Sequence, residues 1–287
     1  MSYYEIGTTY LKKGDYDQAI FYFNKALEID PKFIGAYFNR GVAYFIKRQY
    51  SRAISDFNKA LEIDPNNSDS YINRGTVYLN KGEYDQAISD LNKSLEINSK
   101  DSEAYFKRGL TYDKKGQYDQ AISDYTKTIE IDPNDADAYC NRGSLYTKKK
   151  LYDQAIFDFD KTLEKDPKYV DAYYNRGTVY VKKGQYNQAI SDFDKAIGMN
   201  PKDAEAYLMR GFVYSKREQY DQAISDFCRA IEINPRYALA YYHRGQSYYS
   251  RREYDKSLKD INKAIELGYR IPSEYFDQLR KASRREK

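Results

Sequence analysis

The chain has 287 residues, a formal net charge of +4, 34 tyrosines, one histidine and two cysteines. A single histidine excludes a His-rich metal site, and the scattered Cys140 and Cys228 are not expected to form a disulfide. The small net charge does not indicate a nucleic-acid partner. No apolar run reaches the length of a transmembrane helix, and no hydrophobic signal segment starts the chain. We therefore expect a cytoplasmic protein without a metal ion or cofactor.

The sequence repeats itself with a period of 34 residues. With Val170 taken as position 1 of its copy, Gly occupies position 8 and Tyr occupies positions 4, 11 and 17 in all eight copies. Six of the seven prolines stand at position 32. A fixed period of this length is typical of a solenoid, in which each repeat packs only on its neighbours.

In chain order, the spacing predicts repeats at 1–33, 34–67, 68–101, 102–135, 136–169, 170–203, 204–237 and 238–271, with a capping helix at about 273–285. Ser2 and Glu5 form a predicted capping box at the first helix. Within each repeat we expect helix A at positions 2–14 and helix B at positions 18–31. Gly at position 15 suits the end of helix A, and Pro at position 32 stops helix B. Repeat three has Ser99 in place of this proline.

The apolar pattern places positions 4, 8 and 11 on one face of helix A and positions 20, 24 and 27 on one face of helix B. Gly at position 8 and Ala at position 20 are small, which predicts a close approach of the two helix axes. A larger side chain at either position is expected to overpack the interface.

This pattern resembles the tetratricopeptide repeat family, whose 34-residue unit has an aromatic residue at position 4, Leu at 7, Gly at 8, Tyr at 11, Ala at 20, Phe at 24, Ala at 27 and Pro at 32. The resemblance extends from the start of the chain to about Ile271. Tyr replaces the family's common Trp at position 4, and Arg replaces Leu at position 7. The resemblance implies an all-α, right-handed superhelical solenoid of antiparallel helix pairs. Its concave groove usually binds protein.

Arginine at position 7 occurs together with aspartate at position 23, and repeat one lacks both. This co-occurrence predicts a structural ion pair inside each repeat; the alternative is that the arginines bind acidic ligands. The predicted pairs are Arg40 with Asp56, Arg74 with Asp90, Arg108 with Asp124, Arg142 with Asp158, Arg176 with Asp192, Arg210 with Asp226, and Arg244 with Asp260.

Positions 5 and 6 of helix A face the groove, as the resemblance implies. An Asn side chain offers both a donor and an acceptor, so a row of them is able to hold the backbone of an extended peptide. The alternative is that these polar residues only solvate an exposed face. The predicted groove residues are Asn39, Asn73, Lys107, Asn141, Asn175 and His243 at position 6, and Phe38, Phe106, Tyr174 and Tyr242 at position 5.

No catalytic residues are predicted, and His243 is interpreted as a polar groove residue. The chaperone-adaptor members of the family hold a C-terminal carboxylate with Lys at position 5 and Asn at position 9, among others. Both are missing here, so the clamp for Hsp70 and Hsp90 tails is not expected. We expect a scaffold that binds extended peptide segments. The alternatives are a self-assembling structural protein, with the oligomeric state left open, and a recruitment domain of a larger enzyme.

Overall fold

The computed structural model describes residues 2–271, 276, 279 and 281–282, and this part of the chain is all α-helical, as predicted. Its contacts divide the chain into two compact units, Met1–Leu145 and Tyr146–Lys287, which are treated separately below. The predicted capping helix at 273–285 lies for the most part outside the described residues. Leu279, one of the few residues described in this range, is buried.

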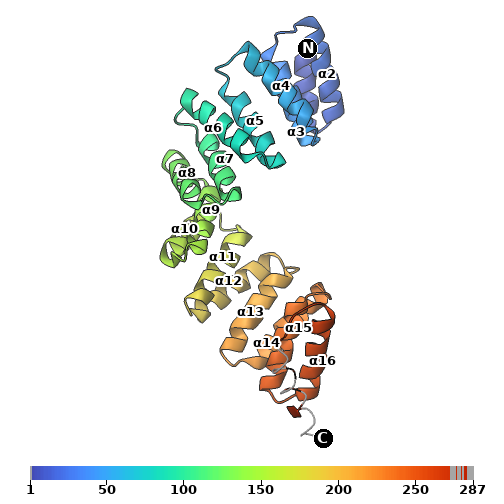
Figure 1. Ribbon diagram of the computed structural model, residues 1–287, viewed down its shortest axis with the longest axis vertical. Helices are drawn as coiled ribbons and strands as arrows, with labels where there is room; N and C mark the ends of the chain where they lie inside the picture. The colour runs from blue at the N-terminus through green and yellow to red at the C-terminus, as the bar shows by residue number, and fades with distance from the viewer. Residues whose placement is uncertain (1, 272–275, 277–278, 280, 283–287) are drawn as a thin grey trace. The chain divides into compact units, whose positions relative to one another are not determined.

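The helices of unit 1 follow one another in pairs (Figure 1). They are α1 (Tyr3–Lys13), α2 (Tyr16–Ile29), α3 (Ile34–Ile46), α4 (Tyr50–Ile63), α5 (Ser68–Lys81), α6 (Tyr84–Ile97), α7 (Ser102–Lys114) and α8 (Tyr118–Ile131), followed by α9 (Ala136–Lys148), in which the division between the units falls. Unit 2 contains α10 (Tyr152–Lys165), α11 (Val170–Lys182), α12 (Tyr186–Met199), α13 (Ala204–Lys216), α14 (Tyr220–Ile233), α15 (Ala238–Ser250) and α16 (Tyr254–Glu266).

The turn between the two helices of a repeat depends on one left-handed residue. Position 15 has a positive φ, between 58° and 80°, in every repeat. Four repeats place Gly there, as predicted, whereas the others place Arg48, Lys150, Glu218 and Arg252. At Gly14 the following amide of Asp15 donates to the carbonyl of Tyr10, which closes a Schellman turn. The chain reverses within two or three residues, so paired helices run antiparallel.

Helix B ends at position 30, and the turn that follows it does not depend on proline. The side chain at position 31 accepts a hydrogen bond from the amide two residues further on, as Asp64 does from Asn66 at 2.9 Å. Repeat three lacks the proline, yet Asn98 accepts from the amide of Lys100 at 3.1 Å and α6 ends at the equivalent residue, Ile97. The helix boundaries otherwise lie within one residue of those predicted, except that α16 ends at Glu266, position 29, two residues before the predicted end.

The core of each repeat forms where helix B packs on helix A. Ala at position 20 and the large residue at position 24 are fully buried, as Ala189 and Phe193 are. A Cβ atom added at Gly177 would lie 2.9 Å from Cε1 of Phe193, so Gly at position 8 permits the close approach that the sequence predicts. The buried positions of helix A also include 3 and 10, as with Ala172 and Val179. The tyrosines at positions 4 and 11 are mostly half-buried.

Candidate protein-interaction surfaces

The predicted ion pair between positions 7 and 23 is present in six repeats. In each, the arginine Nε and Nη2 atoms donate to the two carboxylate oxygens at 2.6 to 2.8 Å. The aspartate side chains are only 5 to 8% exposed. This planar, two-bond geometry is the strongest form of an Arg–carboxylate contact. Arg142 belongs to unit 1 and Asp158 to unit 2, so the seventh pair stays a prediction.

Tyrosines flank the arginine on its own helix. Three residues earlier, Tyr173 has its ring centroid 5.7 Å from the guanidinium of Arg176; four residues later, Tyr180 lies 5.9 Å away. Burial acts against the charge of Arg176 and is the largest single influence, but the hydrogen bonds and negative charges of Asp192 and Asp160 together outweigh it and raise the pKa of Arg176. The arginine therefore stays charged beside two tyrosine rings of its own helix. The tyrosines do not depend on this arginine, because repeat one keeps Tyr3 and Tyr10 with Ile6 at position 7.

The same arginines also link neighbouring repeats, a contact that the sequence did not predict. Each donates its Nη1–H to the side chain at position 25 in helix B of the preceding repeat. Arg108, for example, reaches the Oδ1 atom of Asn92 at 2.6 Å. The acceptors are Asn24, Asn58, Asn92, Thr126, Asp160, Asp194 and Cys228. Position 7 thus connects the two helices of its own repeat with helix B of the preceding one.

A second link between repeats lies near the turns. The acidic residue at position 18 pairs with the basic residue at position 14 of the following repeat, as Asp85 does with Lys115 at 2.5 Å. Lys47 with Asp17, Lys183 with Asp153, and Arg251 with Asp221 form the same pair. The carboxylates are 80 to 89% exposed, so each pair contributes little stability.

The position-6 asparagines differ in their local bonding. Asn39 donates from Nδ2 to the hydroxyl of Tyr4 in the preceding repeat at 2.9 Å, and Asn73 donates to the carbonyl of Asp69 at 2.9 Å. The side-chain amides of Asn141 and Asn175 make no hydrogen bond to the described part of the chain, and both side chains are half-buried. Asn141 lies in unit 1 and Asn175 in unit 2.

The position-5 side chains are part of the repeat core and only partly open. Phe38 packs on Phe57, Phe106 on Tyr125 and Tyr174 on Phe193, with ring centroids 5.7 to 5.9 Å apart. The smaller residues at this position, Ile72, Cys140 and Leu208, are buried.

Two position-5 tyrosines also use their hydroxyls. Tyr174 donates to Oε1 of Glu205 in the next repeat at 2.9 Å. Burial, followed by this hydrogen bond, raises the pKa of Tyr174. The ring centroid of Tyr242 lies 4.6 Å from that of Tyr269, with the rings tilted by 33°, and the Tyr242 hydroxyl accepts a hydrogen bond from Gln246 at 2.8 Å.

His243 sits among aromatic rings rather than in an open groove. Its ring lies 5.5 Å from Phe212, 5.8 Å from Phe227 and 5.3 Å from Tyr242. Its Nδ1 atom lies 3.1 Å from Oε1 of Gln246. Burial, helped by the charge of Lys216, lowers the pKa of His243. The neutral imidazole therefore acts first as a packing group.

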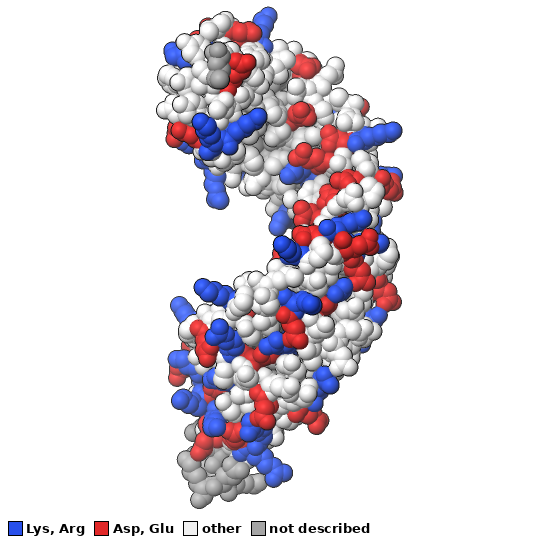
Figure 2. All heavy atoms as spheres, turned by 180° about the vertical axis from the view of Figure 1, so that it is seen from behind, with Lys and Arg blue, Asp and Glu red and all other residues white. Residues whose placement is uncertain are grey.

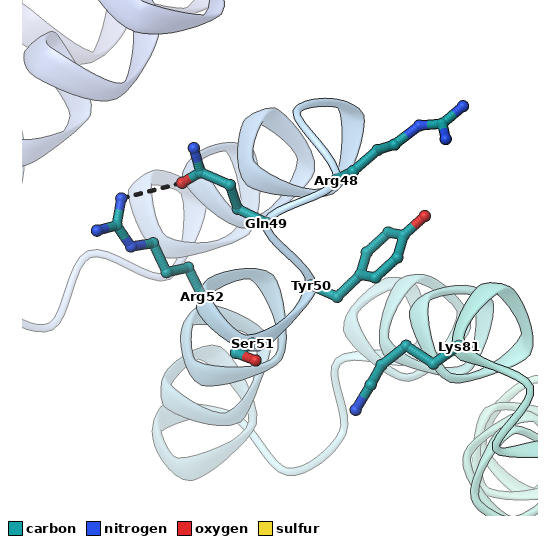
Figure 3. Close-up of a pocket in the computed structure, with 6 residues that line it drawn as sticks. All are labelled: Arg48, Gln49, Tyr50, Ser51, Arg52 and Lys81. Atoms are coloured by element: carbon teal, nitrogen blue, oxygen red, sulfur yellow. Dashed lines mark hydrogen bonds between the residues drawn. The ribbon is translucent and has the colours of Figure 1, made fainter.

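A surface pocket that the sequence did not predict lies at the turn between α3 and α4 (Figure 3). It has a volume of about 480 Å³ and is lined by Arg48, Gln49, Tyr50, Ser51, Arg52 and Lys81. The lining contains three cations and no acidic residue. Elsewhere, acidic and basic side chains are interspersed over the face shown in Figure 2. Exposed i, i+3 pairs such as Lys59 with Glu62 also bring opposite charges together along single helices.

Within the described residues, no group of three or more His, Cys, Asp or Glu side chains is arranged to hold a metal ion. In the same part of the chain, no helix combines the length and the apolar character that crossing a membrane requires.

Profiles of known families match the chain almost from end to end. Profiles described as tetratricopeptide repeat match residues 1–33, 35–67, 136–169 and 170–203, then 57–89 and 193–225, and finally 238–267. A profile described as TPR repeat matches residues 75–116, 113–150 and 211–251. Among proteins of curated function, none matches the chain.

Solved structures share the fold. The TPR protein YrrB, described as having an unusual peptide-binding site, is 28% identical with a TM-score of 0.55, and the match covers 64% of this chain and 95% of YrrB. A crystal structure of MamA is 34% identical with a TM-score of 0.53, covering 58% of this chain and 97% of MamA. A tetratricopeptide repeat protein from Parabacteroides merdae is 23% identical with a TM-score of 0.62, covering 87% and 98%.

The helix pairs, the small residues at their crossings and the profile matches agree over nearly the whole chain. The chain belongs to the tetratricopeptide repeat family.

Proposed function

We propose that this protein is a non-catalytic scaffold that binds extended peptide segments of a partner protein along positions 5 and 6 of its A helices. Membership in the tetratricopeptide repeat family supports a role in protein interaction. YrrB, which has a peptide-binding site, is 28% identical and supports the peptide as the form of the ligand.

The observation that carries this proposal is the free amide at position 6. Asn73 uses its side chain to bond the carbonyl of Asp69 one turn earlier, which is how a helix accommodates asparagine. Asn141 in α9 and Asn175 in α11 make no such bond. Asparagine is a poor helix former, so these residues weaken their helices and form no side-chain hydrogen bond that would compensate. A bound peptide unit would use both the donor and the acceptor of each amide.

The neighbouring side chains suit an extended ligand. Tyr174 precedes Asn175, and its half-buried ring packs on Phe193 with the centroids 5.9 Å apart. A rigid aromatic ring supplies contact area at a small cost in entropy. Because peptide N–H and C=O groups are the same in every sequence, the asparagines would hold the backbone. Lys107 and Met209, which replace Asn, would set preferences for particular side chains, whereas His243 packs among aromatic rings.

Peptides selected from a random display library on the intact protein provide the test. We expect Asn141→Ala to weaken binding of peptides held by unit 1, and Asn175→Ala to weaken those held by unit 2, by at least tenfold, or about 1.4 kcal/mol. Helicity and the thermal midpoint should not fall. Asn134→Ala, on an exposed loop of unit 1, is the matched control and should bind as the wild type does.

Recognition of the peptide backbone predicts the result of a second experiment. A selected peptide with alternate backbone amides N-methylated should lose binding, whereas scrambling its side chains should cost less. If neither asparagine variant changes the affinity of any selected peptide, the binding site lies on another face of the repeats.

A further inference from the structure

The corner where one repeat's turn meets the next repeat follows a fixed charge pattern. Position 18 is acidic in six repeats. Four of these residues, Asp17, Asp85, Asp153 and Asp221, are seen to pair with the basic residue at position 14 of the following repeat. Position 19 is Gln in six repeats. The acid and the base compensate each other, so such a corner carries little net charge.

Repeat two breaks this pattern at both positions. Ser51 replaces the acid, and Arg52 replaces the glutamine. Lys81, the position-14 residue of repeat three, has therefore lost its usual partner and pairs instead with Glu83 in its own turn at 2.6 Å. Position 15 adds a third cation, Arg48, which adopts φ 58° in place of glycine. We name Arg48, Ser51, Arg52 and Lys81 the repeat-two corner.

Two of these cations have no carboxylate partner. Arg52 donates to the uncharged Oε1 of Gln49 at 3.0 Å and lies 5.6 Å from the ring centroid of Tyr44. The guanidinium of Arg48 makes no hydrogen bond or ion pair to the described part of the chain. The position-7 arginines are largely buried and are neutralised by aspartates, whereas Arg48 and Arg52 are exposed, so their two positive charges are accessible to an acidic ligand.

The cations surround the pocket and do not converge on one point. Figure 3 shows Arg48 and Lys81 on either side of the Tyr50 ring, while Arg52 points the other way, beside Gln49. A compact anion such as a phosphate group is bound best by donors that meet at one place. Charges spread around the rim of a 480 Å³ cavity are matched better by several carboxylates along a chain.

We propose that the repeat-two corner binds an acidic segment of a partner protein, a stretch with several Asp or Glu side chains. The carboxylates would pair with Arg48 and Arg52 and compete with Glu83 for Lys81, and the ring of Tyr50 would contact the aliphatic parts of the segment. This site is separate from the position-6 asparagines and does not depend on them.

The test uses a fluorescein-labelled octaglutamate peptide, with octaglutamine as the uncharged control, and follows fluorescence anisotropy on the full chain. We expect octaglutamate alone to bind, and to bind more weakly as the salt concentration rises from about 50 mM to about 300 mM. The double variant Ser51→Asp with Arg52→Gln restores the sequence of the other repeats, so it should fold, and it should bind at least tenfold more weakly.

Two matched variants separate a site from general attraction to a basic protein. Lys195→Gln with Lys202→Gln makes the same change in net charge on exposed residues of unit 2 and should bind as the wild type does. Asp85→Ser with Gln86→Arg copies the altered residues into repeat three and should raise the number of peptides bound. Equal binding by the restored variant and the wild type, equal loss in the Lys195 and Lys202 variant, or binding of octaglutamine would each overturn the proposal.

Discussion

Arg176 and Asp192, sixteen residues apart, meet through two parallel hydrogen bonds: Nε to Oδ2 at 2.8 Å and Nη2 to Oδ1 at 2.7 Å. Asp192 keeps only 6% of its side chain exposed, and Arg176 keeps 18%. The remaining guanidinium nitrogen, Nη1, bonds Asp160 of the preceding repeat at 2.5 Å. One arginine thus joins both helices of its own repeat and the neighbouring repeat, and its removal strands a buried carboxylate.

Replacing Arg176 with leucine should therefore destabilise the protein by about 3 kcal/mol, as expected when one member of a buried pair is lost. Arg176→Leu combined with Asp192→Leu should recover much of this loss, because no charge is then left unpaired near the core. Asp160 is 52% exposed and remains solvated in both variants. Equilibrium denaturation of the wild type, both single variants and the double variant gives the coupling energy. Additive effects would mean that the two side chains do not act as a pair.

Gly177 lies against the ring of Phe193, so its replacement tests how tightly the two helices of a repeat approach. In Gly177→Ala the new methyl group would lie 2.9 Å from Cε1 of Phe193, and we expect a loss of about 1–3 kcal/mol from overpacking. Gly198 in α12 has no atom within 4 Å of such a methyl group and serves as the control. Gly198→Ala should stabilise the protein by up to about 1 kcal/mol, because alanine favours the helix. Equal effects of the two changes on the denaturation midpoint would contradict the close approach.

The 34-residue period was sufficient to predict the helix pairs, most of their boundaries within about a residue and the ion pair between Arg and Asp inside a repeat; the two-bond geometry of that pair was not predicted. These features depend on residues within one repeat, which the sequence shows eight times over. Buried positions 3 and 10 were missed because alanine, valine, threonine and serine alternate there and give a weaker signal than the invariant tyrosines.

Contacts between repeats were harder to predict. The acceptor of each Arg Nη1 changes chemically along the chain, from Asn92 to Asp160 to Cys228, so no motif marks it. The hydrogen bonding of each position-6 asparagine depends on the preceding repeat as well. Asn39 donates to the hydroxyl of Tyr4, whereas the equivalent neighbour of Asn73 is Phe38, which has no hydroxyl. The pocket at the repeat-two corner appears only when Arg48 and Lys81, from different repeats, are placed in space.

Glu218 occupies the left-handed position of its turn with φ 60°, where four other repeats have glycine. A residue with a Cβ atom is strained there, so Glu218→Gly should stabilise the protein by about 0.5–1 kcal/mol once the greater freedom of unfolded glycine is subtracted. The reverse change, Gly184→Ala, meets no atom within 4 Å, so it tests the backbone alone and should destabilise by about 1 kcal/mol. Thermal midpoints of the two variants should move in opposite directions. A lower midpoint for Glu218→Gly would show that its side chain stabilises the turn.

His243, the single histidine of the sequence, makes the unfolding free energy of the protein depend on pH near neutrality. Burial among Phe212, Phe227 and Tyr242 and the charge of Lys216 lower its pKa in the folded state, whereas the unfolded chain has the ordinary value of about 6.5. Below about pH 6.5 the unfolded state therefore binds more protons than the folded state. The stabilisation from the neutral ring is complete above that pH and is lost as the pH falls through the folded-state pKa.

The variant His243→Phe keeps an aromatic ring in the cluster and cannot titrate, so carboxylate effects cancel when it is compared with the wild type. We expect the unfolding free energy of the wild type, relative to this variant, to fall between about pH 7.5 and pH 5, with a slope of at most about 1.4 kcal/mol per pH unit, the limit for one proton. Urea denaturation of both proteins across this range measures the difference. A difference that stays constant with pH would place the imidazole in water and remove it from the aromatic cluster, and a difference that grows on acidification would mean that the folded protein binds the charged ring.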